Sequence, residues 1–436
     1  MTQPMRFCPN CGSPVIAGNR FCSSCGTSLA APTAAAEAPP TTASEKPNGP
    51  PRRRTLWLLA GAGVLLVASG AVAAVLLAGG SSTQHPDAGL IWERVPDLGS
   101  GAIQAVIAGG PGLVAVGWMA DEDNDWDAAV WTSSDGLTWA RAPHDEAHLG
   151  GPDWQAMFDI VPWKGQFVAV GVDGSVDPSF DAAIWTSPDG MTWTRLPDDS
   201  EVFGGNGWQG IRGIAVGGPG LVAVGGTMSY GVSTAAVWVS TDGTTWRRLP
   251  HDARVFGSAG GQVTMGVVQA WHEGLVAIGD ESDEQGYRWP VVWTSRDGLT
   301  WDRSSIADTA AGSSSSTGIN DLVASARGLV AVGWEQEPGT SETRAAVWTS
   351  SDGLAWTRVS HDEMQLGGPG SIGMVAVVSG GPGLVAAGYA RVPIDLRGEG
   401  SDEVDAAVWT SRDGSTWVRV PHDESVFGGS QSEGIR

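Results

Sequence analysis

The pattern of hydrophobic and polar positions divides the chain into segments of different character. Residues 55–78 form an apolar run without a charge, whereas from residue 90 onward Val, Ile and Trp alternate with small residues. Gly-Pro-Gly and Asp-Gly pairs interrupt the second pattern, as expected of strands joined by hairpins, and no stripe with a helical period accompanies it. The pattern predicts an almost entirely β-structured domain over residues 90–436.

A nine-residue unit, W-(T/V)-S-x-D-G-x-x-W, gives this domain a period. Its six copies open 53 to 61 residues apart, at Trp131, Trp185, Trp238, Trp293, Trp348 and Trp409. Each copy accommodates four β segments, which in the first are 102–108, 112–118, 127–133 and 137–142, and such repeats are typical of propeller blades. We expect an all-β, six-bladed propeller. A seven-bladed ring is the alternative, because 91–96 resembles the fourth segment of a copy and 433–436 the start of the first.

The S-x-D-G turn between the third and fourth segments has its own chemistry. Its Asp can accept backbone amides, its Gly supplies a positive φ, and the Trp three residues later packs beneath the hairpin. That Trp is predicted to be core at Trp139, Trp193, Trp246, Trp301, Trp356 and Trp417. The turn resembles the Asp-box of bacterial neuraminidase (BNR-type) repeats, S-x-D-x-G-x-T-W, with one residue fewer between Asp and Gly. The resemblance covers roughly residues 100–429 and implies a sialidase-like propeller in which the box is a structural hairpin remote from the active centre.

All four cysteines lie near the N-terminus, as two Cys-x-x-Cys knuckles at Cys8, Cys11, Cys22 and Cys25. Four thiolates from two tight turns suit tetrahedral Zn²⁺, and a closed shell of four ligands indicates a structural site. Disulfides or a redox Cys-x-x-Cys are the alternative. The repeated F-C-x-x-C-G pattern resembles the short zinc-ribbon domain of many bacterial membrane proteins, which implies a zinc ribbon over residues 1–29 with these cysteines as ligands.

The next segments predict a membrane anchor. Residues 30–54 form a Pro- and Ala-rich linker that ends in the basic cluster Arg52–Arg54. Residues 55–78 are long enough for a transmembrane helix, and 79–89 make a short linker to the propeller. The basic cluster precedes the apolar run, so the ribbon is expected in the cytoplasm and the propeller outside the cell. A cleaved signal peptide is the rival interpretation, but its leader would be unusually long.

Charge narrows the possible partners. The chain has a formal net charge of −23, and after residue 89 it carries 45 Asp+Glu against 19 Lys+Arg. Such a surface repels nucleic acid, so we expect none as a partner. The expected partners are the lipid bilayer, through one transmembrane helix, and an extracytoplasmic protein or glycan.

Two recurring polar elements are candidates for chemistry. A His-Asp-Glu run follows the fourth segment at His144–Glu146, His361–Glu363 and His422–Glu424, and in shortened form at His251–Asp252. Acidic loops between the second and third segments include 121–125 and 280–284. In a propeller these elements share one face and could hold Ca²⁺ or a transition metal. The competing interpretation is that the runs cap turns and recur because the unit was duplicated.

The sequence favours binding over catalysis. A sialidase needs an arginine cluster and a Tyr nucleophile, whereas this chain has three Tyr and its recurring arginines, such as Arg195, Arg358 and Arg419, mark repeat positions. We expect a single-pass membrane protein whose propeller binds a protein, glycan or ion, with no catalytic residues assigned. The alternative function is a divergent sialidase-type glycoside hydrolase.

Overall fold

The chain forms two compact units, Met1–Gly61 and Ala62–Arg436, which are described separately. The computed structural model describes residues 90–96, 98–120, 125–174, 180–205, 207–258, 261–306, 315–336, 339–380, 383–391 and 404–428, and the backbone of four short strands before them. In the first unit, β1 (Arg6–Phe7) pairs antiparallel with β2 (Pro14–Val15).

The second unit contains six four-stranded antiparallel sheets, one for each sequence repeat, and we number them blades 1 to 6. Strands a to d of each blade follow in chain order. Blades 1 to 3 are β6 (Gly101–Gly109), β7 (Gly112–Ala120), β8 (Trp126–Ser133), β9 (Ala140–Arg141); β10 (Gln155–Trp163), β11 (Gln166–Asp173), β12 (Asp181–Ser187), β13 (Thr194–Arg195); β14 (Trp208–Gly217), β15 (Gly220–Ser229), β16 (Val232–Ser240), β17 (Trp246–Arg248). Blades 4 to 6 are β18 (Gln262–Trp271), β19 (Gly274–Ser282), β20 (Arg288–Ser295), β21 (Asp302–Ser305); β22 (Thr317–Ser325), β23 (Gly328–Gln336), β24 (Thr343–Ser350), β25 (Thr357–Arg358); β26 (Ile372–Gly380), β27 (Gly383–Arg391), β28 (Val404–Ser411), β29 (Val418–Arg419).

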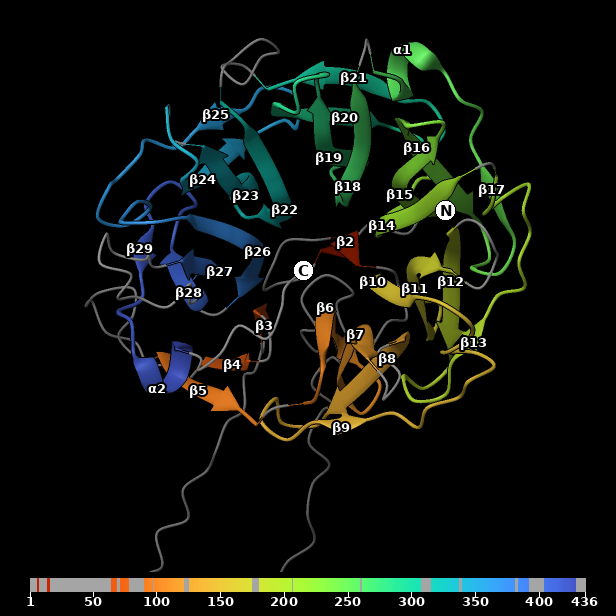
Figure 1. Ribbon diagram of the computed structural model, residues 1–436, viewed down its shortest axis with the longest axis horizontal. Coiled ribbons are helices and arrows are strands. Elements are labelled where there is room, and N and C mark those ends of the chain that lie inside the picture. Colours follow the sequence, from red (N-terminus) through yellow and green to blue (C-terminus); the bar gives the residue numbers. More distant parts are fainter. Residues whose placement is uncertain are drawn as a thin grey trace, which may run out of the picture. The chain divides into compact units, whose positions relative to one another are not determined.

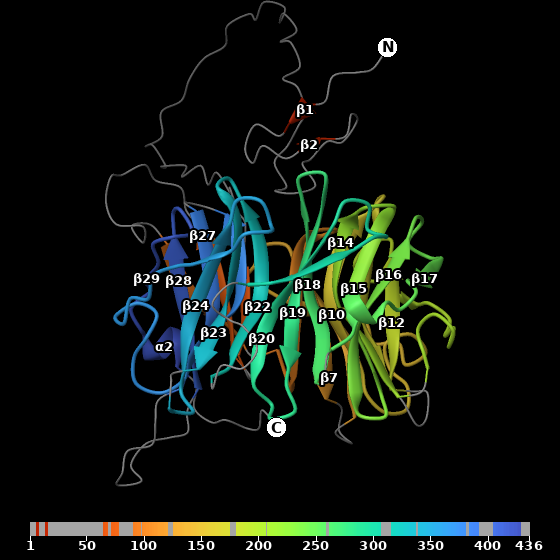
Figure 2. The same ribbon diagram turned by 90° about the horizontal axis from the view of Figure 1, so that it is seen from above.

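The blades stand around a central axis with strand a innermost and strand d outermost (Figure 1). Figure 2 shows that their strands run along the axis of the ring. Each apolar cluster of the core combines residues of two neighbouring sheets, so the core lies between blades. The strand-c tryptophans are 0 to 2% exposed at its centre. The predicted six-repeat, all-β propeller is therefore confirmed.

Every strand a contains a β-bulge where it pairs with strand b. The pairing of strands a and b slips by one residue in each blade, for example between Met157 and Asp159. The slip brings the carbonyl of strand a so close to strand b that a Cβ at Gly171 would lie 1.8 Å from the oxygen of Ala156. The glycine that ends each (Leu/Phe)-Val-Ala-(Val/Ile/Ala)-Gly run is therefore a requirement of the bulge.

The S-x-D-G turn performs its predicted structural role. In blade 3, Oδ1 of Asp242 accepts the backbone amides of Thr244 and Thr245 at 2.8 and 2.7 Å, and Gly243 has φ of 86°. The indole Nε1 of Trp246 donates to the Gly243 carbonyl at 3.1 Å. Five of the six strand-d tryptophans are 4 to 7% exposed, and Trp139 is half-buried.

A three-stranded sheet lies between blade 6 and blade 1, consisting of β3 (Val64–Ala68), β4 (Ala71–Leu77) and β5 (Leu90–Val95) (Figure 1). β5 takes the outer position of a strand d, as the similarity of residues 91–96 predicted. β3 and β4 fall within residues 55–78, for which the sequence predicts a transmembrane helix. No helix within the described residues is long and apolar enough to cross a membrane. The structure differs from the prediction here because short runs of Val, Leu and Ala suit a buried strand as well as a helix.

Candidate functional site

The predicted zinc ligands Cys8, Cys11, Cys22 and Cys25 lie outside the described residues. The hairpin of β1 and β2 is the described part of this unit, and the first knuckle falls in the connection between its strands. The ligand assignment therefore remains a prediction.

The His-Asp-Glu runs after strand d form single helical turns, seen most clearly in α1 (Ala253–Phe256) and α2 (Glu424–Phe427). The Asp of each run caps its turn, as Asp423 does by accepting the backbone amide of Ser425 at 2.9 Å. Four residues after this Asp, an apolar side chain is buried in the core, and in blade 6 this is Phe427 at 5% exposure. Blade 2 has the same turn with Asp199 as its cap. Turn capping, one of the two predicted interpretations, is confirmed for the Asp.

These turns also join neighbouring blades. The strand-c indole of the following blade donates to a carbonyl in the turn, at distances of 2.7 to 2.8 Å. The pairs are Trp185 to His148, Trp238 to Val202, Trp293 to Val255 and Trp409 to Gln365. Trp131 and Trp348 have no partner for the indole N–H within the described residues. Both follow connections that lack the run, namely residues 96–100 and the segment after Ile306.

The strand-d arginines also have a structural role. Arg195 pairs with Asp173 at 2.8 Å and Arg303 with Glu281 at 2.5 Å, so that strand d is tied to strand b of its own blade. Arg358 makes the same pair with Glu335. Their interpretation as repeat elements agrees with these contacts.

Two of the runs meet a carboxylate from the start of strand c. In blade 1, Nε2 of His144 lies 3.0 Å from Glu146 Oε2 and 3.6 Å from Asp127 Oδ2. In blade 6, Nε2 of His422 lies 3.0 Å from Glu424 Oε2 and 3.9 Å from Asp405 Oδ2. In each triad the three ligand atoms lie within 4.8 Å of one another, a spacing that suits a metal ion.

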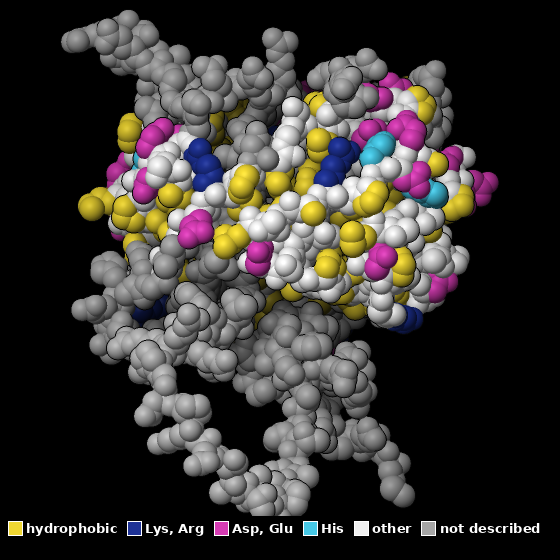
Figure 3. Space-filling model, turned by 90° about the horizontal axis from the view of Figure 1, so that it is seen from below, with side chains coloured by type: hydrophobic (Ala, Val, Ile, Leu, Met, Phe, Trp, Pro, Cys, Tyr) yellow, Lys and Arg dark blue, Asp and Glu magenta, His cyan; other side chains and the backbone are white. Residues whose placement is uncertain are grey.

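Other blades carry different residues at these positions. Blade 5 has Arg344 in the place of the strand-c Asp, although His361 and Glu363 remain hydrogen-bonded at 2.9 Å. Blade 2 has Asp181 and Asp198, and burial together with the Asp198 charge raises the pKa of Asp181 to about 6. Figure 3 shows histidine and carboxylate side chains beside one another on the outer surface of the ring.

The described carboxylates of the acidic loops between strands b and c make local contacts instead of forming the predicted metal site. Residues 121–124 lie outside the described residues, and Asp125 caps its own neighbour, Trp126. In the loop at 280–284, Glu281 is engaged by Arg303, and Asp283 accepts the amides of Gln285 and Tyr287. Within the described residues, groups with metal-binding geometry are the two triads and not these loops.

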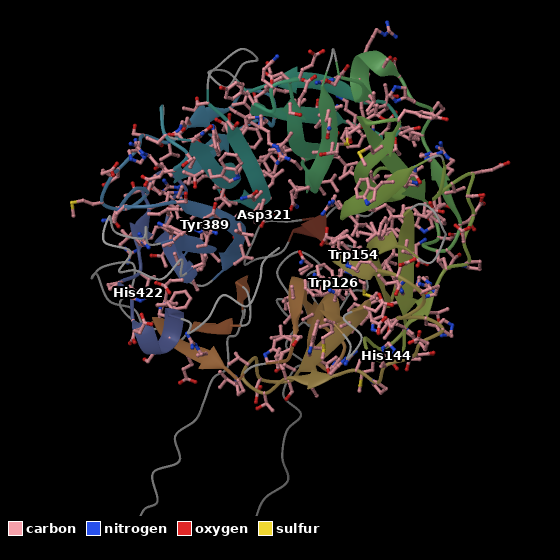
Figure 4. All side chains as sticks on the ribbon, viewed as in Figure 1. Trp126, His144, Trp154, Asp321, Tyr389 and His422 are labelled. Carbon is pink, nitrogen blue, oxygen red and sulfur yellow. The ribbon has the colours of Figure 1, made fainter. Side chains whose placement is uncertain are left out.

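A cluster of aromatic side chains lies on the face where strand b ends and strand c begins. Trp118 and Trp126 are stacked with ring centroids 4.0 Å apart and an interplanar angle of 6°. Trp154 packs edge-on against Trp126 at 5.0 Å, and Phe180 packs edge-on against Trp154 at 5.5 Å. All four side chains are half-buried. Figure 4 places Trp126 and Trp154 towards the central axis of the ring, whereas His144 and His422 lie near the outer edge.

The innermost strands carry polar groups near their bulges. Arg212, at the bulge of β14, lies over the rings of Phe158 at 4.6 Å and Trp208 at 5.5 Å. Asp159 accepts the backbone amide of Ile214 in the next blade at 2.8 Å, and desolvation raises the pKa of Asp159 to about 7.

Asp321, on β22 near the centre of the ring (Figure 4), makes the same kind of inter-blade contact, accepting the backbone amide of Val377 at 2.7 Å. Desolvation raises the pKa of Asp321 to about 6. The two carboxylates therefore connect blade 2 to blade 3 and blade 5 to blade 6 at the inner wall of the ring.

Sequence reasoning named the His and Glu of each triad as candidates, but it missed the strand-c Asp of each triad and the aromatic cluster. A signal existed for the triads, because an Asp stands four residues before the strand-c Trp in three copies, at Asp127, Asp181 and Asp405. A signal also existed for the cluster, because its tryptophans lie outside the two Trp positions of the repeated unit. The hairpin of the blade therefore does not require them.

Comparisons with known proteins identify the N-terminal domain. Residues 7–29 match the family model described as a zinc-ribbon domain, in agreement with the predicted ribbon. No curated protein matches the chain.

Solved structures resemble the propeller at low identity. The α-L-arabinofuranosidase Arb93A from Fusarium graminearum is 16% identical with a TM-score of 0.41, covering 60% of this chain and 79% of that one. A protein of unknown function from Dyadobacter fermentans is 15% identical with a TM-score of 0.39, covering 60% and 82%. A glycosyl hydrolase from Bacteroides ovatus is 13% identical with a TM-score of 0.32, covering 64% and 89%. These values are too low to carry an argument about activity.

Proposed function

We propose that the propeller is a glycan-binding module that performs no chemistry on its ligand. The observation that carries this proposal is the half-buried cluster of Trp118, Trp126, Trp154 and Phe180 at the face where strand c begins. The cluster is preformed by contacts between its own rings, so little conformational entropy is lost when a ligand covers it.

The chemistry of the cluster suits a sugar. Aromatic rings are apolar on their faces and carry a negative face potential, which favours the polarised C–H groups of a pyranose or furanose ring. Polar groups near the apolar wall then fix the orientation of a ligand. Arg212, exposed at the bulge of β14, is available for hydroxyl or carboxylate groups.

Binding to a glycan array, followed by calorimetry with the best ligand, tests this proposal. The change Trp126→Ala removes the ring that contacts both Trp118 and Trp154, and we expect at least a tenfold loss of affinity, or about 1.4 kcal/mol. The matched control is Trp163→Ala, a half-buried Trp at the a–b hairpin on the opposite face. Equal affinities of the two variants would contradict the proposal.

Hydrolysis is the second candidate function, and Asp159 favours it. A carboxyl group whose pKa is raised to about 7 is protonated near neutral pH, as a glycosidase acid must be. Both oxygens of Asp159 accept backbone amides, from Ile160 and Ile214, which supports a structural role instead. Turnover of fluorogenic glycosides, sialosides included, that is lost in Asp159→Asn but not in Trp163→Ala would establish the hydrolase.

We also propose that the protein is anchored in the membrane through residues 55–78, with the ribbon in the cytoplasm. A spanning segment must satisfy its backbone hydrogen bonds within itself, which a helix does in lipid. In the structure the same residues satisfy them through neighbouring strands, since β3 pairs with β4 and β4 pairs with β5. Protease treatment of intact cells should remove the propeller and leave the ribbon epitope. A propeller protected in intact cells but cleaved after lysis would contradict this topology.

The zinc ribbon should bind one Zn²⁺ through Cys8, Cys11, Cys22 and Cys25 as a structural centre. Metal analysis of full-length Cys8→Ser/Cys11→Ser should show the loss of one tightly bound zinc ion, while glycan binding by the propeller is retained. Zinc content equal to that of the unaltered chain would overturn the assignment.

A further inference from the structure

The structure assigns two further metal sites, on the propeller. We propose that each triad binds one divalent transition-metal ion of the zinc class, through the imidazole Nε2 and one oxygen from each carboxylate. The ligands are Asp127, His144 and Glu146 in blade 1, and Asp405, His422 and Glu424 in blade 6.

The distances within the triads fit this coordination. Zn–N and Zn–O bonds of about 2.0–2.2 Å place the ligands of a tetrahedral ion roughly 3.4 Å apart. His144 Nε2 lies 3.0 Å and 3.6 Å from its two carboxylate oxygens, and His422 Nε2 lies 3.0 Å and 3.9 Å from its pair. A metal ion therefore requires only small side-chain movements.

A proton satisfies the triad less well than a metal ion does. A proton on Nε2 of His144 makes one hydrogen bond to Glu146 at 3.0 Å, while Asp127 Oδ2 lies 3.6 Å from the same nitrogen, beyond ordinary hydrogen-bond distance for that proton. A metal ion engages all three atoms and offsets the charge of both carboxylates. The imidazole selects the zinc class over Ca²⁺, which prefers six to eight oxygen ligands.

Glycine makes room for the ligands in both blades. A Cβ at Gly150 would lie 2.5 Å from Glu146 Oε2 and 3.0 Å from Asp127 Oδ1, so any side chain there would displace both carboxylates. In blade 6, a Cβ at Gly428 would lie 2.3 Å from the Glu424 carboxylate. Asp127 is largely buried, with 11% of its side chain exposed, so it is a fixed ligand onto which the turn closes.

A bound metal ion would restrain the turns that join neighbouring blades. In blade 1 the turn carries the His148 carbonyl, which accepts the indole N–H of Trp185. In blade 6 it is α2, whose Val426 carbonyl accepts Arg94 of β5. A metal ion that ties strand c to the turn therefore stabilises one blade junction directly and, in blade 6, the closure of the ring.

Metal counting on the full-length protein, equilibrated with Zn²⁺ alone, tests the sites. We expect one ion for the ribbon and one for each triad, hence a loss of one ion in Asp127→Asn, one in Asp405→Asn and both in the double variant. The matched control Glu363→Gln alters blade 5, where Arg344 stands in the place of the triad Asp, and should lose none. A double variant that retains the full zinc content would overturn the proposal.

A variant that gains a site distinguishes the loss of a metal ligand from the loss of zinc through misfolding. Arg344→Asp gives blade 5 the residues of a triad beside His361 and Glu363, and we expect it to bind one additional zinc ion. Zn²⁺ should also raise the Tm of the unaltered chain and leave that of the double variant unchanged, because binding to the folded state stabilises it. No additional ion in Arg344→Asp and no shift of Tm in the unaltered chain would each count against the sites. Neither result bears on glycan binding, which rests on Trp126.

Discussion

The guanidinium Nε of Arg94 donates a hydrogen bond of 3.1 Å to the carbonyl oxygen of Val426, which lies 332 residues further along the chain. Beside it, the ring of Trp92 packs edge-on against Phe427 at 5.9 Å. Arg248 makes the same kind of contact, donating to the Gly204 carbonyl in the turn of the preceding blade at 3.2 Å. The turn of the last blade thus holds β5 as each of the other turns holds the blade that follows it.

Removal of the Trp92 ring should weaken this closure. We expect Trp92→Ala to lower the free energy of unfolding by roughly 2 kcal/mol, because the ring is half-buried between β5 and α2. Urea denaturation measures the change. Leu354→Ala is the control, since it removes an exposed apolar side chain from a hairpin turn away from the closing contact. The same loss in both variants would show that the closing contact contributes nothing specific.

The indole hydrogen bonds between blades can be tested by a pair of matched substitutions. Trp238→Phe removes the N–H that donates to Val202, whereas Trp131→Phe removes one without a partner among the described residues. Both changes shorten a buried side chain in the same way. We expect Trp238→Phe to be the more destabilising by about 1 kcal/mol, the net value of one hydrogen bond, in thermal and urea denaturation. Equal losses would argue against the junction.

The turn carboxylates should contribute to stability above acidic pH. Backbone hydrogen bonds from Thr245 and Thr244 hold the pKa of Asp242 below its ordinary value of 3.8. A lowered pKa in the folded state means that the contribution is present above pH 3.8 and is lost as pH falls through the folded-state pKa. We expect Asp242→Ala to be less stable than the unaltered chain by about 1 kcal/mol at pH 7, with a smaller difference at pH 3. The exposed Asp302→Ala should show neither effect, and a difference independent of pH would contradict the explanation.

Asp159 and Asp321, the two carboxylates of the innermost strands, should affect the pH dependence of stability in the opposite direction. Desolvation raises the pKa of Asp159 to about 7 and that of Asp321 to about 6. Their contribution to stability is fully present below the unfolded-state pKa near 3.8 and is lost as pH rises through these values.

We therefore expect stability to fall between about pH 4 and pH 7, with each group contributing at most about 1.4 kcal/mol per pH unit. Asp159→Asn and Asp321→Asn should each make this dependence shallower, as measured by denaturation across the range. Asp302→Asn, which alters an exposed carboxylate on β21, should leave it unchanged. Variants with the slope of the unaltered chain would show that these groups do not titrate with folding.

Several features could be predicted because their cause is local. A turn of four residues specifies its own Asp, Gly and Trp, and two Cys-x-x-Cys knuckles suit a zinc ribbon without reference to the rest of the chain. The six blades follow from the repeat, and the strand-d arginines could be recognised as repeat elements from their spacing.

Other features depend on residues that the fold brings together. Asp127 precedes His144 by a whole hairpin, and Asp405 is related to His422 in the same way, so only the pairing of strands with turns joins them. Trp118, Trp126 and Trp154 come from two blades, and their stacking depends on how these blades pack.

The sequence by itself determined the all-β class, the six repeats, the hairpin turns and the ribbon, because each rests on hydrogen bonds or periodicity within a few dozen residues. The tertiary structure alone decided where the ring closes, which histidines lie beside a strand-c carboxylate and which tryptophans gather on one face. Those outcomes depend on contacts between residues far apart in the chain, and the free energy of such contacts is not encoded in any single segment. For residues 64–77 the local apolar pattern suits a helix and a strand alike, so the surrounding partners, whether neighbouring strands or lipid, determine the conformation.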